Sequence, residues 1–308
     1  MVYDVIVAGG GPAGMTAVIY AQRAMLKTLV IEKNYMSGGQ IINTYEVDNY
    51  PGLPGINGFD LAMQVEAHAK KLGADIVNAE IETIRVNEES GLKEVVTSEG
   101  VYQAKTVIIC LGAAHRHIGV PGEAEFGGKG VSYCATCDGA FYRDKTVVVV
   151  GGGDVAIEDA IFLARQSKKV YVVHRRDALR ATKVLQEALF ALPNVEMVWD
   201  SAVAEIKGEA QVSSVVINNL KDDSQREIET DGVFIAIGLD PVTAAVKDTV
   251  TLNSQGYIVA GEDTKTNVPG IFAAGDIRTT PLRQIITAMA DGAVAVSQVQ
   301  NYLTEAGK

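Results

Sequence analysis

The sequence contains the same local pattern twice, and this repeat limits the folds that the chain can adopt. Residues Tyr3–Ala8 form a short apolar run that ends at Gly9-Gly10-Gly11-Pro12-Ala13-Gly14, and a helical pattern, Met15–Ala24, comes next. Residues Thr146–Val150 lead in the same way into Gly151-Gly152-Gly153-Asp154-Val155-Ala156 and a second helical pattern. Both copies therefore predict a buried strand, a glycine turn and a helix, in that order.

Each small residue in the pattern G-x-G-x-x-G/A has a separate physical task. The first permits a tight turn, the second lets the backbone approach a pyrophosphate, and the third allows close packing of the helix. These residues are Gly9, Gly11 and Gly14 in the first copy and Gly151, Gly153 and Ala156 in the second. One such turn also occurs in unrelated α/β proteins, but two copies predict an α/β chain with two Rossmann-like nucleotide-binding domains.

The two copies differ at the end of their second strand, where such units meet the adenosine ribose. The first copy has Glu32-Lys33 there, and a glutamate that accepts hydrogen bonds from ribose hydroxyls suits FAD or NAD. The second copy has His174-Arg175-Arg176, with Arg180 one helical turn beyond, and a basic cluster suits a 2'-phosphate. We therefore expect FAD in the first copy and NADPH in the second. The simpler alternative for the basic residues is a solvated turn.

The order of the patterns predicts a discontinuous first domain. The apolar run Lys105–Gly112 and its counterpart Gly232–Gly238 each suit the closing strand of a domain. The segment Val268–Asp276 does not continue the second pattern and predicts a return to the first domain, with a final helix over Leu282–Tyr302. We expect an FAD-binding domain in residues 1–114 and 243–308, and an NADPH-binding domain in residues 115–242.

Charge and hydrophobic patterning restrict the partners and the location. A formal net charge of -11 opposes binding to the phosphate backbone, so we expect no nucleic-acid partner. The apolar runs are much shorter than the ~20 residues that a membrane helix needs. The first strand begins at Val2 with no signal-like segment before it, so we expect a soluble, cytoplasmic protein.

Three cysteines occur, and two of them are the candidates for redox chemistry. Cys134-Ala135-Thr136-Cys137 has the spacing of a small-ring disulfide whose thiolates can form reversibly. The same cysteines could instead bind zinc together with His115 and His117. We expect the third cysteine, Cys110, to be a buried structural thiol, because it lies in an apolar run.

Several further motifs, together with those above, make the whole chain resemble the low-molecular-weight thioredoxin reductases. The motifs are Gly38-Gly39-Gln40, Glu46-Val47-Asp48-Asn49-Tyr50-Pro51-Gly52, Cys134-Ala135-Thr136-Cys137-Asp138, His174 to Arg180, Gly275-Asp276 and Arg283-Gln284, between and beyond the two glycine turns. The resemblance implies a homodimer formed through the FAD domains, as well as thioredoxin or a similar small disulfide protein as the partner.

The resemblance also implies roles for individual residues. The residues expected at FAD, beyond the first glycine turn and Glu32, are Gly39, Gln40, Asn49, Gly275, Asp276, Arg283, Gln284 and Ile285. Without the resemblance, Gln40 and Asn49 would be interpreted as ordinary loop residues, and Asp276 as a turn or cap.

For the chemistry, the family implies that NADPH reduces the flavin, that reduced flavin opens the disulfide through Cys137, and that Cys134 attacks the partner's disulfide. Asp138 would be the proton donor or acceptor, although an Asp before Gly139 is also a common turn residue. The domains would rotate on hinges near residues 113–119 and 239–243.

Three positions depart from the family pattern, namely Val155, Asp159 and Val242. The loss of a hydroxyl at Val155 keeps open a second possibility, in which ferredoxin or another carrier is the electron donor, and the acceptor could also be a different small protein such as a peroxiredoxin. A third hypothesis is a flavin-binding redox sensor without turnover. Two nucleotide sites argue against this hypothesis, because they imply electron flow between them.

Overall fold

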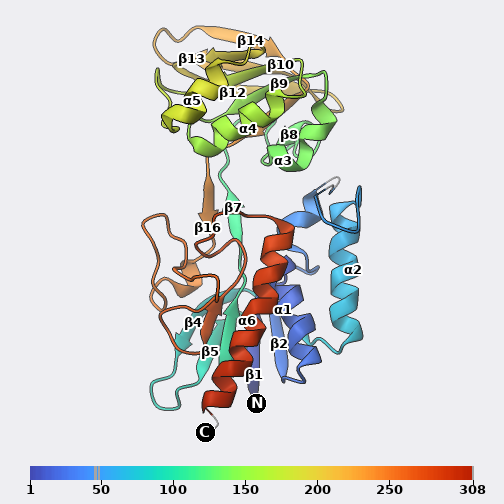
Figure 1. Cartoon of the computed structure of the whole chain (residues 1–308), viewed down its shortest axis with the longest axis vertical. Coiled ribbons are helices and arrows are strands. Elements are labelled where there is room, and N and C mark those ends of the chain that lie inside the picture. The colour runs from blue at the N-terminus through green and yellow to red at the C-terminus, as the bar shows by residue number, and fades with distance from the viewer. Residues whose placement is uncertain (45–46, 48, 307–308) are drawn as a thin grey trace. The chain divides into compact units, whose positions relative to one another are not determined.

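The computed structural model describes residues 1–44, 47 and 49–306, which fold into two compact units (Figure 1). Unit 1 comprises Met1–Ala114 and Asp240–Lys308, and unit 2 comprises His115–Leu239. The strands β7 (Ala113–His115) and β16 (Leu239–Pro241) contain the two chain crossings and pair with each other. The assignment of a nucleotide to each domain, with the predicted second boundary at 242/243, stays a prediction.

Unit 1 is built on a seven-stranded sheet. Its strands are β1 (Val2–Ala8), β2 (Thr28–Glu32), β3 (Ile76–Asn78), β4 (Ile81–Val86), β5 (Lys93–Thr97), β6 (Gly100–Ile109) and β17 (Ile271–Ala273). The order is β3-β2-β1-β6-β5-β4, and β17 also pairs with β6. The pairs that involve β1, β2, β3 and β17 are parallel, whereas β4, β5 and β6 pair antiparallel.

The helices of unit 1 are α1 (Pro12–Arg23), α2 (Gly58–Lys71) and α6 (Ile285–Ala306), with short 3-10 turns η1 (Gly39–Asn43) and η3 (Ala244–Val246). Side chains of β1 alternate between two cores. Val5 and Val7 pack with residues of α1 and α6, while Ile6 and Ala8 pack in the core that includes Ile258. Because both faces of this parallel strand are buried from Val5 to Ala8, every residue there is apolar, and the sequence shows one continuous apolar run.

Unit 2 repeats this plan around a fully parallel sheet. The strands β8 (Val131–Ser132), β9 (Thr146–Val150), β10 (Lys169–Val173), β11 (Val195–Val198) and β15 (Gly232–Ile235) have the order β11-β10-β9-β15-β8. The helices are α3 (Ala135–Asp138), α4 (Asp154–Ala164) and α5 (Lys183–Phe190), with the 3-10 turn η2 (Gly139–Tyr142). An antiparallel sheet of β12 (Ser201–Gly208), β13 (Val212–Asn219) and β14 (Gln225–Glu229) covers one face.

The repeat predicted from the sequence is confirmed at the level of strands and helices. Each first strand lies beside its second strand, and α1 begins directly at Pro12, because proline suits the first position of a helix. The α/β class is therefore confirmed. One local expectation is wrong: residues 175–178 form bends and not a helical turn. The ring of His174 donates to the carbonyl oxygen of Ala178, and this bond holds the segment in a loop.

The chain returns to unit 1 through β17 and α6. β17 pairs with β6 through Ile271 and Val107, and α6 then packs along α1 (Figure 1). The two helices approach closely at Gly292, where a Cβ atom would lie 2.2 Å from the carbonyl oxygen of Ala13. A side chain at residue 292 would therefore push α6 away from the first glycine turn.

We expect Gly292→Ala to lower the free energy of unfolding by about 1–3 kcal/mol, because the added methyl group meets backbone that cannot move aside. The matched control is Ser297→Ala on the exposed face of the same helix, which should change stability by less than about 0.5 kcal/mol. Chemical denaturation measures both values. Equal stability of the two variants would contradict the close packing of α6 on α1.

Candidate active site

The two glycine turns contain glycines of two kinds. At some positions a side chain would clash with the backbone, and at others there is room for one. At Gly9, which has φ +104°, a Cβ would lie 2.4 Å from the carbonyl oxygen of Cys110, and at Gly14 it would lie 1.9 Å from that of Gly9. At Gly11 the nearest atom would be 4.0 Å away, and at Gly153 none of the described residues comes within 4 Å. The open positions are the two that sequence reasoning assigned to a pyrophosphate.

Both helices that begin at these turns lack a side-chain cap. Gly11 is the N-cap of α1 and Gly153 is the N-cap of α4. Neither glycine has a side chain that could accept a hydrogen bond from the amides of the first helical turn. Free amides at a helix N-terminus form a ready anion site. Open backbone and uncapped helix ends therefore fit a dinucleotide pyrophosphate at each turn.

The residue that ends each second strand braces its own glycine turn. In unit 1, Oε2 of Glu32 accepts a hydrogen bond from the amide of Gly10 at 2.6 Å. In unit 2, the imidazole of His174 lies so close to Gly152 that a Cβ there would be 2.3 Å from the ring. Glu32 and His174 are both buried, and they occupy equivalent positions of the repeat. This bracing role was not expected from the sequence.

His174 is buried, whereas the three arginines that were grouped with it are exposed. Its Nε2 donates to the carbonyl oxygen of Ala178 at 3.2 Å, and burial, together with the nearby arginine charges, lowers its pKa. The ring is therefore neutral near pH 7. Arg175, Arg176 and Arg180 are exposed, and the amide of Arg180 donates to the carbonyl oxygen of Gly152 at 2.8 Å, which holds this loop beside the turn.

The structure brings several of the residues expected at FAD together in pairs. Gly39 lies against Gly11, and Nδ2 of Asn49 donates to Oε1 of Gln284 at 2.9 Å, although these residues are 235 positions apart. The side chain of Gln40 donates to the carbonyl oxygen of Ala113. The motif residues Glu46 and Asp48 lie outside the described residues.

The carboxyl-terminal part of unit 1 adds an acidic and a basic side chain to this group. Gly275 has φ +80° and lies against Ala13, which places the next residue, Asp276, beside the first turn. Burial raises the pKa of Asp276 to about 6, and the charge of Arg283 opposes this shift. Ile285 is the first residue of α6.

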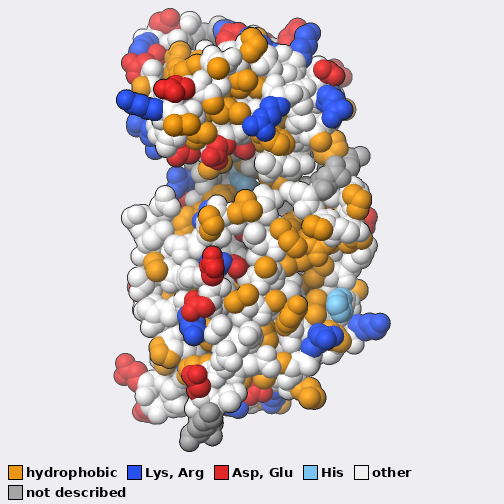
Figure 2. Space-filling model, viewed as in Figure 1, with side chains coloured by type: hydrophobic (Ala, Val, Ile, Leu, Met, Phe, Trp, Pro, Cys, Tyr) orange, Lys and Arg blue, Asp and Glu red, His pale blue; other side chains and the backbone are white. Residues whose placement is uncertain are grey.

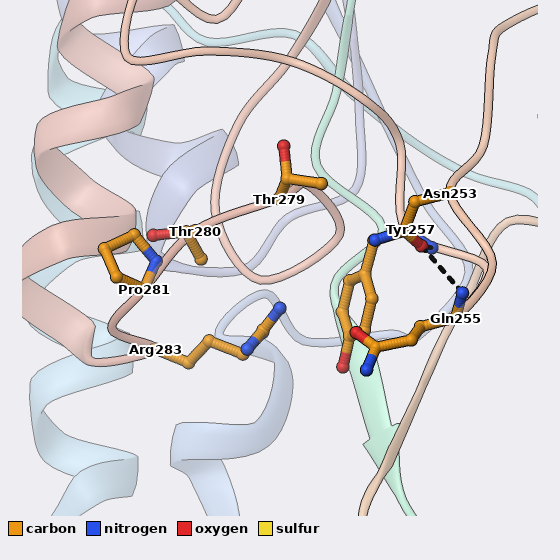
Figure 3. Close-up of a pocket in the computed structure, with 7 residues that line it drawn as sticks. All are labelled: Asn253, Gln255, Tyr257, Thr279, Thr280, Pro281 and Arg283. Atoms are coloured by element: carbon orange, nitrogen blue, oxygen red, sulfur yellow. Dashed lines mark hydrogen bonds between the residues drawn. The ribbon is translucent and has the colours of Figure 1, made fainter.

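Arg283 borders an open pocket of about 400 Å³ within unit 1 (Figure 3). Its guanidinium carbon lies 4.1 Å from the centre of the Tyr257 ring, and its Nε is buried with no hydrogen-bond partner among the described residues. A buried donor without a partner is costly, so this group is suited to a ligand acceptor. The other lining residues are Asn253, Gln255, Thr279, Thr280 and Pro281.

A buried ion pair that sequence reasoning missed supports this region. Oδ2 of Asp291 accepts from Nε of Arg278 at 2.6 Å and from the amide of Gly275 at 2.9 Å, and Oδ1 accepts from Nη2 of Arg278 at 2.6 Å. Asp291 lies on α6, so the pair fastens the Gly275-Asp276 turn to that helix. The signal in the sequence was an acidic residue, Asp291, flanked by small and apolar side chains in the first half of a helix.

The sulfur atoms of Cys134 and Cys137 are joined in a disulfide, with their Cα atoms 5.3 Å apart. The remaining cysteine, Cys110, is a free and buried thiol, and burial raises its pKa far above the ordinary range. Within the described residues there is no group of three or more His, Cys, Asp or Glu side chains that could hold a metal ion. The disulfide favours the redox interpretation over the zinc alternative.

Asp138 ends the short helix that carries the disulfide. Burial raises its pKa, and a hydrogen bond from the hydroxyl of Ser132 to Oδ2, 2.6 Å long, opposes the shift. A carboxyl group with a raised pKa can take up and release a proton at a higher pH than an ordinary aspartate. Cys134 and Cys137 are both partly exposed, so burial does not tell their roles apart.

The three departures from the family pattern have different settings. Val155 is exposed in the first turn of α4, where its apolar side chain offers no hydrogen bond. Asp159 is further along α4, and burial, with the charge of Glu158, raises its pKa to about 7. Val242 lies just beyond β16, and its amide donates to the carbonyl oxygen of Gly112 at 3.0 Å.

Comparison with known proteins assigns this architecture to a class. The family model described as pyridine nucleotide-disulphide oxidoreductase matches residues 3–292. The chain therefore belongs to the pyridine nucleotide-disulphide oxidoreductase family, and within it to the low-molecular-weight thioredoxin reductases, which are flavin-dependent disulfide reductases.

The individual relatives support the narrower group. The thioredoxin reductases of Listeria innocua and Bacillus subtilis are each 46% identical over 305 residues, which is 99% of this chain and 95% or 96% of theirs. The crystal structure of thioredoxin reductase from Streptococcus pyogenes matches with a TM-score of 0.93 at 46% identity and covers 99% of both chains. The enzyme from Giardia duodenalis matches with a TM-score of 0.90 at 36% identity, covering 98% of this chain and 99% of that one.

The surface adds little to the definition of the site. No helix in the described part of the chain is long and apolar enough to cross a membrane. On the face drawn in Figure 2, acidic and basic side chains are interspersed, and neither sign gathers into a broad area. Hydrophobic side chains gather over α1 and α2, which carry the exposed residues Tyr20 and Phe59 (Figure 2).

We expect Asp291→Ala to lower the free energy of unfolding by about 3–5 kcal/mol, because Arg278 would remain buried without its partner. The double variant Arg278→Met/Asp291→Leu should lose much less, since no unpaired charge remains. Lys265→Ala, which removes an exposed pair with Asp263, is the control and should cost less than about 1 kcal/mol. Denaturation curves would contradict this account if Asp291→Ala and the control were equally stable.

Proposed function

We propose that unit 1 binds FAD, that unit 2 binds NADPH, and that the chain uses them to reduce the disulfide of thioredoxin through Cys134 and Cys137. The observation that carries the proposal is the pair of open glycine turns, at Gly11 and Gly153, in one chain with a disulfide. Bound flavin would accept a hydride from NADPH and pass two electrons to this disulfide.

The residues of unit 1 fit the parts of FAD. The amides after Gly11 would hold the pyrophosphate. Oε1 of Glu32 accepts a hydrogen bond from the amide of Asn34, and its second lone pair would accept from a ribose hydroxyl. The other residues that we assign to FAD are Gly9, Pro12, Ala13, Gly14, Lys33, Gly39, Gln40, Asn49, Gly275, Asp276, Arg283, Gln284 and Ile285. The unpaired Nε of Arg283 supports an acceptor group of the cofactor nearby.

In unit 2, the three exposed arginines would hold the 2'-phosphate of NADPH. Guanidinium groups bind phosphate with two parallel hydrogen bonds, and the loop that carries them is fixed to the turn by Arg180. Gly151, Gly153, Asp154, Val155 and Ala156 would approach the pyrophosphate. His174 would support the glycine turn at Gly152 and would not bind the phosphate itself, because its ring is buried and neutral.

We assign the nucleophile for the partner's disulfide to Cys134 and the sulfur next to the flavin to Cys137. Exchange between a thiol and a disulfide needs a thiolate, so a nearby group must take and return protons. Asp138 suits this task because its pKa is raised by burial.

The reaction needs the flavin to meet first the nicotinamide and then the disulfide, and a rotation of the domains would allow this. The position of the first predicted hinge, near residues 113–119, can be revised. Buried Glu123 accepts hydrogen bonds from the amides of Ile118 and Gly119 and from the hydroxyl of Tyr133, which tie that part of the segment to unit 2. We therefore propose that the hinge lies just before the predicted segment, at Gly112, which has φ +72° and where an added Cβ would meet no atom of the described residues within 4 Å.

The remaining features of the proposal rest on the family. The curated relatives are named thioredoxin reductases, which supports thioredoxin as the partner here. We propose a homodimer through unit 1, and the hydrophobic side chains over α1 and α2 support this choice of surface (Figure 2). A cytoplasmic location stays a prediction.

We expect NADPH, added without oxygen to the flavin-loaded protein, to bleach the flavin, and thioredoxin disulfide to restore its colour. NADH should require a concentration at least about tenfold higher, because it lacks the phosphate that the arginines bind. A Cys134→Ser/Cys137→Ser variant should still be bleached but should fail to reduce thioredoxin. Bleaching by reduced ferredoxin and not by NADPH would establish the alternative donor, and turnover by the double variant would contradict the role of the disulfide.

A further inference from the structure

The hydroxyl of Ser132 lies between the disulfide and its acidic neighbour. Ser132 is the last residue of β8 and is 4% exposed. Its Oγ donates to Oδ2 of Asp138 at 2.6 Å and accepts from the amide of Cys134 at 3.1 Å. The carbonyl oxygen of Cys134 is a second possible acceptor, at 3.4 Å from the same Oγ.

A hydroxyl has one hydrogen to donate, so these contacts depend on the charge of Asp138. An ionised carboxylate can only accept, and the hydroxyl then donates to it. When Asp138 carries a proton, the hydroxyl is free to turn toward the carbonyl oxygen of Cys134, while the bond from the amide of Cys134 is kept. One side chain thus connects the ionisation of Asp138 with the backbone of Cys134.

The titratable residues of the elements that pack against α3 are mostly acidic. The helix α3 packs against η2 and α4. The titratable residue of η2 is Tyr142, whose pKa is raised to about 12 by burial and by the charges of Asp138 and Asp231. The titratable residues of α4 are Asp154, Glu158 and Asp159, all of them acidic. The hydroxyl of Ser132, at the end of β8, donates a hydrogen bond to the Asp138 carboxylate.

We propose that Ser132 is a positioning residue for proton transfer at the disulfide, because its hydroxyl holds the Asp138 carboxylate ionised and fixed beside Cys134. The inference rests on the proton-transfer role proposed above for Asp138. It adds a residue that selects which form of the carboxyl group is present when the reduced enzyme meets its partner.

The step balances in atoms and electrons. The thiol of Cys134 gives its proton to Asp138, its sulfur attacks the partner's disulfide, and the leaving sulfur of the partner takes that proton from Asp138. The thiol of Cys137 then loses its proton to Asp138 and attacks the mixed disulfide, so that the Cys134–Cys137 bond forms and the second partner sulfur receives the proton. The partner gains two electrons and two protons, and the enzyme's dithiol loses them.

The direct test measures the carboxyl group of Asp138 in the oxidised, FAD-loaded protein by difference infrared titration, with Asp138→Asn identifying its band. We expect Ser132→Ala to raise the pKa of Asp138 by about one pH unit, because a hydrogen bond to the charged form is lost. Ser132→Thr should restore the value of the unaltered protein. Ser132→Gly makes the same comparison if the alanine variant does not fold.

The matched control is Ser214→Ala. The hydroxyl of Ser214 donates to Oε1 of Glu227, also at 2.6 Å, in the antiparallel sheet of the same unit, and Ser214 is buried as well. This variant should leave the pKa of Asp138 unchanged. An unchanged pKa of Asp138 in both Ser132→Ala and Ser132→Gly would overturn the proposal.

A second measurement separates this inference from the proposed role of Asp138. Asp138→Asn should slow disulfide exchange with thioredoxin by about a hundredfold or more and remove the pH dependence that the carboxyl group causes. Ser132→Ala should instead move that dependence to higher pH. If Asp138→Asn leaves the pH dependence intact, the role of Asp138 fails. If it removes the dependence and Ser132→Ala does not shift it, the role of Ser132 alone fails.

Discussion

The contact between a glycine turn and the first turn of the adjoining helix is the constraint on which the rest of the structure depends. At Gly9 and Gly14 there is no room for a side chain, since a Cβ would meet carbonyl oxygens of the backbone. This close approach sets α1 against β1 and leaves the helix N-terminus open at Gly11. The chain uses the same solution at Gly151 and Gly153, and Ala156, whose methyl group is buried, takes the third position there. A polar ligand site therefore arises from backbone geometry before any charged side chain is added.

The chemical difference between the two units comes from the residue that ends the second strand and from the loop directly after it. Glu32 and His174 brace equivalent glycines, one with a carboxylate and the other with a neutral ring. Only the second unit then continues into a loop with three exposed arginines. In unit 1 the later return of the chain supplies Asp276 and Arg283, and the buried pair of Arg278 and Asp291 holds that return in place. The same fold thus offers two glycine turns in settings of different charge, which suit the two different nucleotides that we propose.

Sequence reasoning predicted the features that depend on local pattern. The two strand–turn–helix units and the final helix were predicted from apolar periodicity and glycine spacing, and the structure contains them. The disulfide between Cys134 and Cys137 was expected from spacing and from the family. The neutral state of His174 was not expected from the sequence. The histidine lies next to arginines in the chain, but it is buried against Gly152 and bonded to Ala178. The chain after the bends at residues 175–178 is held by a tertiary hydrogen bond, from the amide of Thr182 to Oδ1 of Asp154, which the local sequence also does not reveal.

The positions that sequence alone could not assign share a physical reason. Ser132 and Asp138 are near each other in the chain, but their hydrogen bond depends on how β8 leads into α3. Arg278 and Asp291 are brought together by α6 packing on α1, which no local pattern encodes. Such contacts join elements with separate periodicities, so they become visible only when the elements are placed in space.

The most direct test of the account compares Gly11→Val with Gly153→Val, since each fills one open turn. Flavin content and the affinity for NADP would be measured on both purified variants. The account predicts that Gly11→Val loses FAD and still binds NADP, whereas Gly153→Val keeps FAD and loses NADP affinity by about a hundredfold or more. If both variants lost the same nucleotide, or if neither lost one, the assignment of one nucleotide to each unit would be contradicted.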